Sequence, residues 1–159
     1  MDALIRLLQQ DSTVSHADLA RMLDMSEAAV DKEIARLEAS GLIIGYQAIV
    51  NREKWEPDTV TAMIEVRLTP ERAGGFDRLA ARIAKFEEVR SCYLVSGGYD
   101  LLLVVEGQTL REVATFVAEK LSPMGAVQAS ATHFRLKTYK ENGTYHALEE
   151  TPERLSVTP

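Results

Sequence analysis

The chain has 159 residues, 46% of them hydrophobic, with a formal net charge of −6 and a pI near 5.1. This length and composition suit one ordinary domain or two small ones and exclude a chain that is mainly disordered. The acidic balance excludes a protein that coats nucleic acid or anionic membrane nonspecifically, yet it leaves sequence-specific DNA binding open.

The few cysteine and histidine residues argue against disulfides and metal sites. Cys92 is the single cysteine, so the chain has no intramolecular disulfide and no thiolate cluster. The three histidines lie far apart, without companions at ligand spacing, so we expect no metal and no cofactor. No apolar run approaches the roughly 20 residues that span a bilayer, and the start of the chain lacks a secretion signal. We therefore expect a cytoplasmic protein without a membrane partner.

Residues 1–50 contain the signals of three short helices. Asp2, Ser15 and Ser26 can each cap a segment whose apolar residues repeat at helical spacing. Only two residues separate the second segment from the third, and the first of these, Asp24, tolerates the left-handed conformation of a sharp turn. Helices joined this tightly form a helix-turn-helix, so this region is predicted to bind DNA.

The segment after the third helix changes character. Gly41 is a natural helix terminator, and the sequence that follows it, "LIIGYQAIVN", is β-branched and apolar enough to be a strand or a wing. Residues 51–58 are polar and contain a proline, which predicts a linker between two domains.

Residues 59–140 show the pattern of a second domain. Residues 59–68 alternate as a strand does, and Thr69, Pro70 and Glu71 open a helical stretch that runs to Phe86. The later elements are a strand over 89–96, a turn at 97–98, a strand over 99–106, a helix over 109–121 and a strand over 126–139. This β-α-β-β-α-β order predicts an α+β ferredoxin-like fold. Residues 141–159 are predicted to be a tail.

The strand segment "LLLVV", residues 101–105, is apolar on both faces. A sheet with helices on one side does not require this, so another surface must cover the second face. The economical candidate is the same sheet of a second copy, because two-fold homodimers are the commonest oligomers.

Taken together, "RLEASGLIIGYQAIVN" after a helix-turn-helix, "SGGYDLLLVVEG" and "VQASATHFRLKTYKENG" give the chain a specific resemblance. From residue 2 to about 140 it resembles the Lrp/AsnC (leucine-responsive regulatory protein and asparagine operon regulator) family. The resemblance implies a transcription factor that dimerises through its ferredoxin-like domain, often assembles into tetramers or octamers, and senses amino acids or related metabolites.

The predicted recognition helix, residues 26–40, is rich in acid. On a helical projection, the direction opposite its buried stripe holds Lys32, small alanines and, to one side, Arg36, whereas the carboxylates lie on the flanks. Asp31 can accept from a cytosine amino group or belong to a solvated surface. With Arg52 and Lys54 as supplementary phosphate contacts, the predicted DNA-binding residues are Ser26, Glu27, Ala28, Asp31, Lys32, Arg36, Arg52 and Lys54. Because phosphate contacts supply much of the affinity, we expect binding to need repeated half-sites.

The predicted effector site begins at residues 97–100. Gly97, Gly98, Tyr99 and Asp100 match the family's Gly-Asp-Tyr-Asp loop in three of four places. The resemblance puts this loop at an effector pocket between subunits, where Asp100 would accept from an ammonium group and backbone amides would bind a carboxylate. The resemblance also adds the hydroxyls of Ser130 and Thr132. The alternative is a plain Gly-Gly hairpin with Asp100 satisfied locally.

Two other functions stay open from the sequence. The first is a metabolite-binding oligomer whose helix-turn-helix binds DNA weakly or not at all, which the acidic amino-terminal region favours. The second is an enzyme, because sirohaem decarboxylases resemble the same family. Such an enzyme needs a histidine- and arginine-bearing pocket, whereas "NREKWEPDTVTAMIEV" contains no histidine. The leading interpretation is therefore a DNA-binding regulator and not an enzyme.

Overall fold

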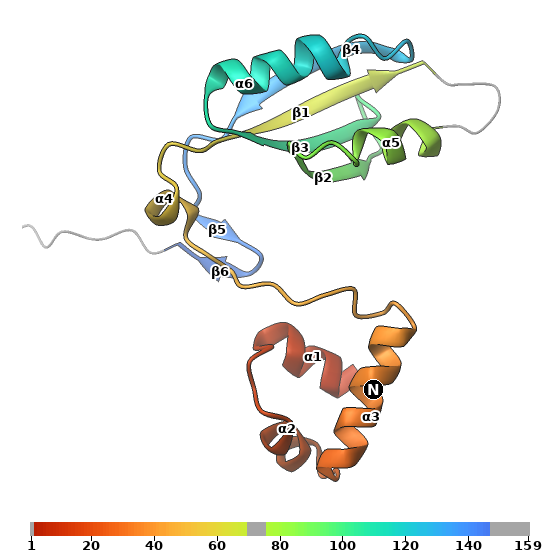
Figure 1. The fold of residues 1–159 in the computed structure, drawn as a ribbon, viewed down its shortest axis with the longest axis vertical. Helices are drawn as coiled ribbons and strands as arrows, with labels where there is room; N and C mark the ends of the chain where they lie inside the picture. Colours follow the sequence, from red (N-terminus) through yellow and green to blue (C-terminus); the bar gives the residue numbers. More distant parts are fainter. Residues whose placement is uncertain (1, 70–75, 147–159) are drawn as a thin grey trace, which may run out of the picture. The chain divides into compact units, whose positions relative to one another are not determined.

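The computed structural model describes residues 2–69 and 76–146, and the chain divides into two compact units, residues 1–49 and 50–159 (Figure 1). In those two ranges, no helix has the length and apolar character needed to cross a membrane. The predicted opening of a helix at Pro70 and Glu71 lies outside the described residues.

The first unit contains the three predicted helices, α1 (Asp2–Gln10), α2 (His16–Leu23) and α3 (Glu27–Ala39). Ser15 Oγ accepts a hydrogen bond from Asp18 N, and Ser26 Oγ accepts one from Ala29 N, so two of the three predicted caps are confirmed. Asp2, the third, is the first residue of α1 itself. Asp24 adopts the left-handed conformation, with φ of 52°, in the turn between α2 and α3. The sequence therefore specifies this helix-turn-helix locally.

A small core holds these three helices together. Leu4 comes from α1, and the other fully buried side chains come from α2 and α3: Leu19, Ala20, Val30, Ile34 and Leu37. The predicted stripe of Val30, Ile34 and Leu37 is thus the buried face of α3, which leaves the opposite face of this helix to solvent.

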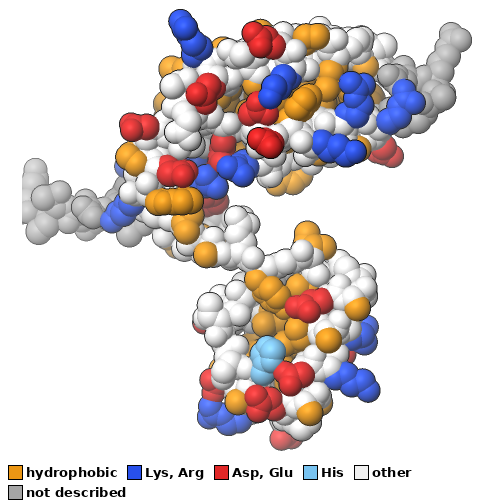
Figure 2. Space-filling view, viewed as in Figure 1, with side chains coloured by type: hydrophobic (Ala, Val, Ile, Leu, Met, Phe, Trp, Pro, Cys, Tyr) orange, Lys and Arg blue, Asp and Glu red, His pale blue; other side chains and the backbone are white. Residues whose placement is uncertain are grey.

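Gly41 ends α3 as predicted. It has a φ of 71°, and the amide of Leu42 bonds back to the carbonyl of Leu37 at 3.0 Å, as in a Schellman motif. The strand or wing predicted after it does not form a strand, because residues 44–50 have no regular secondary structure and no strand is present within residues 2–49. A strand needs a neighbouring strand to pair with, and the described part of this unit offers only helices. Apolar side chains stay exposed along the segment, and hydrophobic side chains are visible on this unit in Figure 2.

The second unit is a four-stranded antiparallel sheet in the order β2-β3-β1-β4. Its strands are β1 (Val60–Leu68), β2 (Val89–Leu94), β3 (Leu101–Gly107) and β4 (Val127–Phe134). The helices α5 (Asp77–Ile83) and α6 (Leu110–Thr115) cover the sheet, and a π-helical turn, η1 (Phe116–Leu121), continues α6. This is the predicted ferredoxin-like order, although the last strand is shorter than expected.

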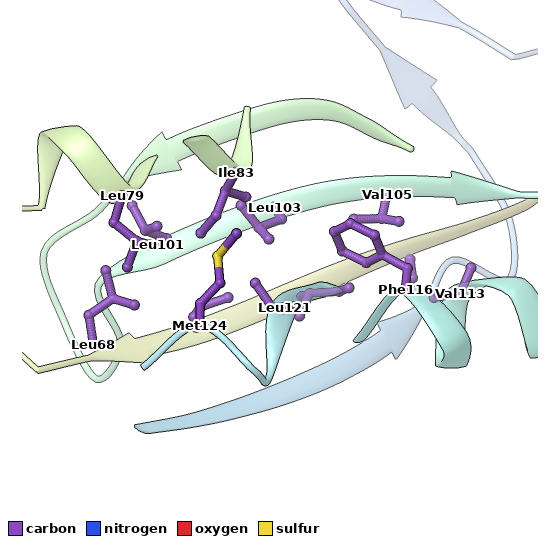
Figure 3. Close-up of a cluster of buried hydrophobic side chains, with 13 residues drawn as sticks. Leu68, Leu79, Ile83, Leu101, Leu103, Val105, Val113, Phe116, Leu121 and Met124 are labelled. Atoms are coloured by element: carbon purple, nitrogen blue, oxygen red, sulfur yellow. The ribbon is translucent and has the colours of Figure 1, made fainter. Parts of the chain in front are cut away.

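The core of this unit lies between the sheet and its helices (Figure 3). Alternate residues of β1 and β3 are fully buried, as period-two patterning predicts, and Phe116 of η1 packs edge-on against Phe86 with ring centroids 5.6 Å apart. The other side of the sheet, here called the open face, carries Met63 and Tyr93, which are 41% and 53% exposed.

Two short elements extend this unit beyond the predicted sheet. In the segment predicted as a linker, residues 51–58, the helix α4 (Arg52–Trp55) is capped by Asn51, whose Oδ1 accepts from Lys54 N. A hairpin of β5 (Lys140–Glu141) and β6 (Thr144–Tyr145) occupies the start of the predicted tail. Its turn residues Asn142 and Gly143 both have positive φ, as an Asn-Gly hairpin requires.

Candidate DNA interface and effector site

The exposed face of α3 carries the small and basic side chains that the sequence predicts. Ala28, Lys32, Ala35 and Ala39 are all exposed, opposite the buried stripe of this helix. Small side chains allow the backbone to approach a major groove closely, and Lys32 supplies a positive charge there. Ser26, which caps the helix, and Glu27, in its first turn, are also exposed.

Three of the carboxylates that flank this face, Asp31, Glu33 and Glu38, have partners inside the same unit. Asp31 Oδ1 lies 2.5 Å from His16 Nδ1, the first residue of α2. Glu38 Oε1 accepts a hydrogen bond from the Tyr46 hydroxyl at 3.0 Å. Burial, and then this bond to Glu38, raises the pKa of Tyr46, so the phenol stays protonated as a donor. These contacts hold both carboxylates against protein groups.

Glu33 and Arg36 form the i, i+3 pair expected from the sequence. Glu33 Oε2 accepts from Arg36 Nε at 2.9 Å, and Oε1 accepts from Nη2 at 2.8 Å, which is a two-pronged contact. The hydrogen bonds to Arg36 lower the pKa of Glu33. Arg36 thus stands on the helix surface with part of its charge neutralised, which makes Lys32 the stronger cation of this face.

The two supplementary phosphate contacts have different surroundings. Arg52 is three-quarters buried and pairs with Glu106 on β3, at 3.0 Å between Nη1 and Oε2. Arg90 reaches the same Glu106 oxygen at 2.6 Å. This cluster holds α4 against the sheet, and the Arg52 side chain is therefore paired within the protein. Lys54, by comparison, is exposed.

The glycine loop, residues 97–100, joins β2 to β3. Val95 N donates to Asp100 O at 2.9 Å, and Gly97 has a φ of 145°, a conformation that favours glycine. The Asp100 carboxylate accepts from Leu68 N at 2.7 Å, at the end of β1. The predicted ammonium acceptor is therefore already bonded to a backbone amide of the protein.

A hollow of about 200 Å³ lies beside this loop. We call it the effector hollow. Its lining residues are Glu65, Arg67, Gly98, Tyr99, Ala129, Ser130 and Ala131. Arg67 Nη2 donates to Gly98 O at 2.7 Å, and Glu65 Oε1 lies 3.5 Å from His133 Nε2. One opening thus presents a guanidinium and a carboxylate two residues apart on β1.

The strand register places Ser130 and Thr132 on the opposite face of the sheet from Glu65 and Arg67. Glu65 pairs with Ala131 and Arg67 with Ala129, on the open face, whereas Ser130 pairs with the buried Val66. Directly paired residues share a face, so the Ser130 side chain belongs to the helix-bearing side even though the residue borders the hollow. Thr132 pairs with the buried Ile64 and also lies on the helix-bearing side. Gly98 and Tyr99 are the predicted residues that meet Glu65 and Arg67 here.

Comparison with known proteins matches both units. Residues 61–145 match the Lrp/AsnC ligand binding domain, and residues 1–47 match a helix-turn-helix domain. The chain is 38% identical over 157 residues to the uncharacterized HTH-type transcriptional regulator YugG of Bacillus subtilis, covering 98% of this chain and 95% of that protein.

Solved structures agree with this match. The leucine response regulatory protein LrpA of Mycobacterium tuberculosis superposes with a TM-score of 0.74 at 26% identity, over 89% of this chain and 94% of that one. The transcriptional regulator NMB0573 of Neisseria meningitidis, solved as a complex with L-Met, gives a TM-score of 0.69 at 25% identity, over 87% and 88%. The chain therefore belongs to the Lrp/AsnC family of transcriptional regulators, and it is a DNA-binding regulator with a ligand-binding domain.

Proposed function

We propose that an amino acid or a closely related metabolite controls this regulator by binding in the effector hollow. The observation that carries the proposal is the placement of Glu65 and Arg67 around one opening beside Gly98 and Tyr99. A free amino acid has an ammonium group and a carboxylate two bonds apart, so its recognition requires groups of both signs in one small site.

Each group has a definite role in this proposal. Arg67 binds the carboxylate of the effector, because a guanidinium presents two parallel N–H donors to it. Glu65 accepts from the ammonium, and the carbonyl of Gly98, which also accepts from Arg67, is a second acceptor in the same hollow. Asp100 keeps the loop in place through its bond to Leu68 N. The relative solved with L-Met supports an amino acid as the ligand class.

A second copy of the chain completes the site in this proposal. The effector hollow opens on the open face of the sheet, where Met63 and Tyr93 are exposed although they are apolar or aromatic. Covering this face with the same face of a partner would bury those side chains and shield the charges of the hollow from water. The assembly is thus a homodimer or a higher oligomer, such as a tetramer or octamer.

Sequence-specific DNA contact is assigned to α3, with Lys32 as its main cation, acting in the cytoplasm. The partners of Asp31, Glu33 and Glu38 support this assignment, because they limit the repulsion between these carboxylates and phosphates. They also weigh against the alternative of an effector-binding oligomer that has lost DNA binding. Arg52 serves as an anchor of α4 and not as a phosphate contact.

Calorimetric titration of the full chain with each of the twenty amino acids tests the effector site. We expect at least one to bind, and Arg67→Ala to weaken that binding by roughly tenfold or more, because it removes a charge-assisted pair. Arg111→Ala is the matched control, since Arg111 is an exposed arginine of α6. If none of the twenty binds, an amino acid is excluded as the effector, and if both variants bind the effector equally well, the proposed site is overturned.

A further inference from the structure

The second unit has an exposed surface whose composition the effector site does not explain. It is formed by α4 and by the chain around the β5–β6 hairpin, and Figure 2 shows basic, acidic and hydrophobic side chains together in this region. We call it the lysine–aromatic surface, and its members are Lys54, Trp55, Lys137, Tyr139, Lys140 and Tyr145. All six side chains are exposed, including three large aromatic ones.

The fold holds the two parts of this surface together. Glu53 Oε1 of α4 accepts a hydrogen bond from the buried Thr138 N at 2.9 Å, which ties the helix to the segment between Lys137 and Tyr139. His146 N donates to Tyr139 O at 3.0 Å and closes the hairpin back on that segment. The arrangement is therefore built by tertiary contacts and is not a chance property of a free tail.

The acidic residues of this region engage other protein groups. Glu53 bonds to Thr138 N, Glu141 accepts from Arg135 Nη1 at 3.0 Å, and Glu56 faces Arg52 and Thr59. Lys54, Lys137 and Lys140 are all exposed. This surface therefore presents three ammonium groups to solvent, although the whole chain carries a net charge of −6.

The aromatic rings position the lysines. Lys137 Nζ lies 5.5 Å from the centroid of the Tyr139 ring, and Lys140 Nζ lies 4.6 Å from that of Tyr145, its direct partner across the hairpin. An aromatic ring under an ammonium group limits the motion of that group. Unlike a carboxylate, the ring does not neutralise the positive charge. Each tyrosine also brings a hydroxyl donor to the same place, and Tyr139 and Tyr145 are 63% and 76% exposed.

We propose that the lysine–aromatic surface binds the phosphate backbone of double-stranded DNA outside the bases that the helix-turn-helix reads. Fixed ammonium groups and tyrosine hydroxyls are typical phosphate donors, and such contacts add affinity without reading sequence. This second contact compensates for the few cations of α3. It is independent of the effector and of the residues of the effector hollow.

Binding of the full chain to a random-sequence 60-base-pair duplex tests this proposal, because phosphate contacts need no operator. Affinity is measured by fluorescence anisotropy at several salt concentrations, for the wild type and for Lys137→Gln/Lys140→Gln. We expect the double variant to bind about tenfold more weakly at low salt. The slope of log K against log salt should fall by roughly 2, since each lost phosphate contact removes about 0.9.

Two further variants complete the design. Lys137→Arg/Lys140→Arg keeps the charges and should restore the slope, which a purely structural role would not require. Lys85→Gln removes an exposed lysine at the end of α5 and should leave the slope unchanged. Equal slopes for Lys85→Gln and the glutamine double variant would overturn the proposal.

Assembly and strand type are measured in the same samples. We expect sedimentation of the double variant to match the wild type. If the variant dissociates and its weaker binding follows from that alone, the surface is a subunit interface and the proposal fails. A loss confined to a single-stranded probe of the same length would also overturn it. Lys32→Ala separates the two contacts, because it should abolish preference for an operator and leave this surface intact.

Discussion

His16 Nδ1 lies 2.5 Å from Asp31 Oδ1, joining the first residue of α2 to the middle of α3. This contact gives His16 a role that its isolated place in the sequence did not suggest. It turns the Asp31 carboxylate, which is next to Lys32 in sequence, toward a ring nitrogen of His16. This contact gives one carboxylate of the acidic helix a partner within the protein.

Replacement of His16 tests this role. We predict that His16→Ala weakens DNA binding several-fold, because the freed Asp31 carboxylate then faces phosphates without a partner. Anisotropy titration of one duplex at fixed salt measures the change. The double variant His16→Ala/Asp31→Asn removes the charge as well and should bind at least as well as the wild type. A double variant as weak as His16→Ala would show that the ring, and not the carboxylate, matters.

Breaking the pair of Glu33 and Arg36 should change DNA affinity in the opposite direction, toward tighter binding. Glu33→Gln should strengthen DNA binding several-fold and make its salt dependence steeper by about 1, because it releases the full charge of Arg36 toward phosphate. The hydrogen bonds to Arg36 lower the pKa of Glu33, so the wild-type residue is fully ionised at neutral pH. Unchanged affinity in Glu33→Gln would place Arg36 away from the DNA.

The lowered pKa of Glu33 also fixes the pH at which the pair matters for stability. The folded state binds the proton less readily than the unfolded state, so the pair stabilises the fold above the ordinary carboxyl pKa. That contribution is lost as the pH falls through the lowered value. Salt should reduce it, because both groups lie on the surface of α3.

The sequence was sufficient for the elements whose signals are local or periodic. Ser15, Ser26 and Asp24 behave as their side chains predict, because capping and left-handed turns depend on a few neighbouring residues. The alternate burial of β1, and of residues 101, 103 and 105 in β3, likewise follows from the period-two geometry of a strand.

The sequence was insufficient where structure depends on distant partners. Residues 44–50 have strand-forming side chains, but a strand forms only beside another strand, and a propensity cannot supply one. The hairpin of β5 and β6 was missed although Asn142 and Gly143 are a strong turn signal, since the flanking strands are only two residues each.

The residues that line the effector hollow could also be predicted only in part from the sequence. Glu65 and Arg67 are not among the effector residues predicted from the sequence, because the buried alternate residues of β1 and the glycine loop give the stronger signals. Their own alternation, on the other face of the strand, was the available signal. That they meet Gly98 and Tyr99 depends on pairing across the sheet, which the sequence of β1 alone does not specify.

Asp100 and Arg67 should separate stability from effector binding. We predict that Asp100→Ala lowers the free energy of unfolding by about 1–3 kcal/mol, because it leaves the Leu68 amide without its acceptor. Arg67→Ala should change stability little, since Arg67 is exposed. Urea unfolding followed by circular dichroism measures both. If Asp100→Ala were as stable as the wild type, the carboxylate would be available for the effector after all.

The last prediction concerns the open face of the sheet. Leu102 lies there between Glu65 and Tyr93, its direct partners on β1 and β2, and it is half-buried within one copy. Leu102→Glu would place a carboxylate at the centre of the proposed subunit contact and next to Glu65, where like charges repel. We expect the variant to sediment as a folded monomer at micromolar concentration. Leu110→Glu, at an exposed leucine of α6, should assemble like the wild type. Assembly that survives Leu102→Glu would assign the contact to another surface, and the effector hollow would then lack the partner that closes it.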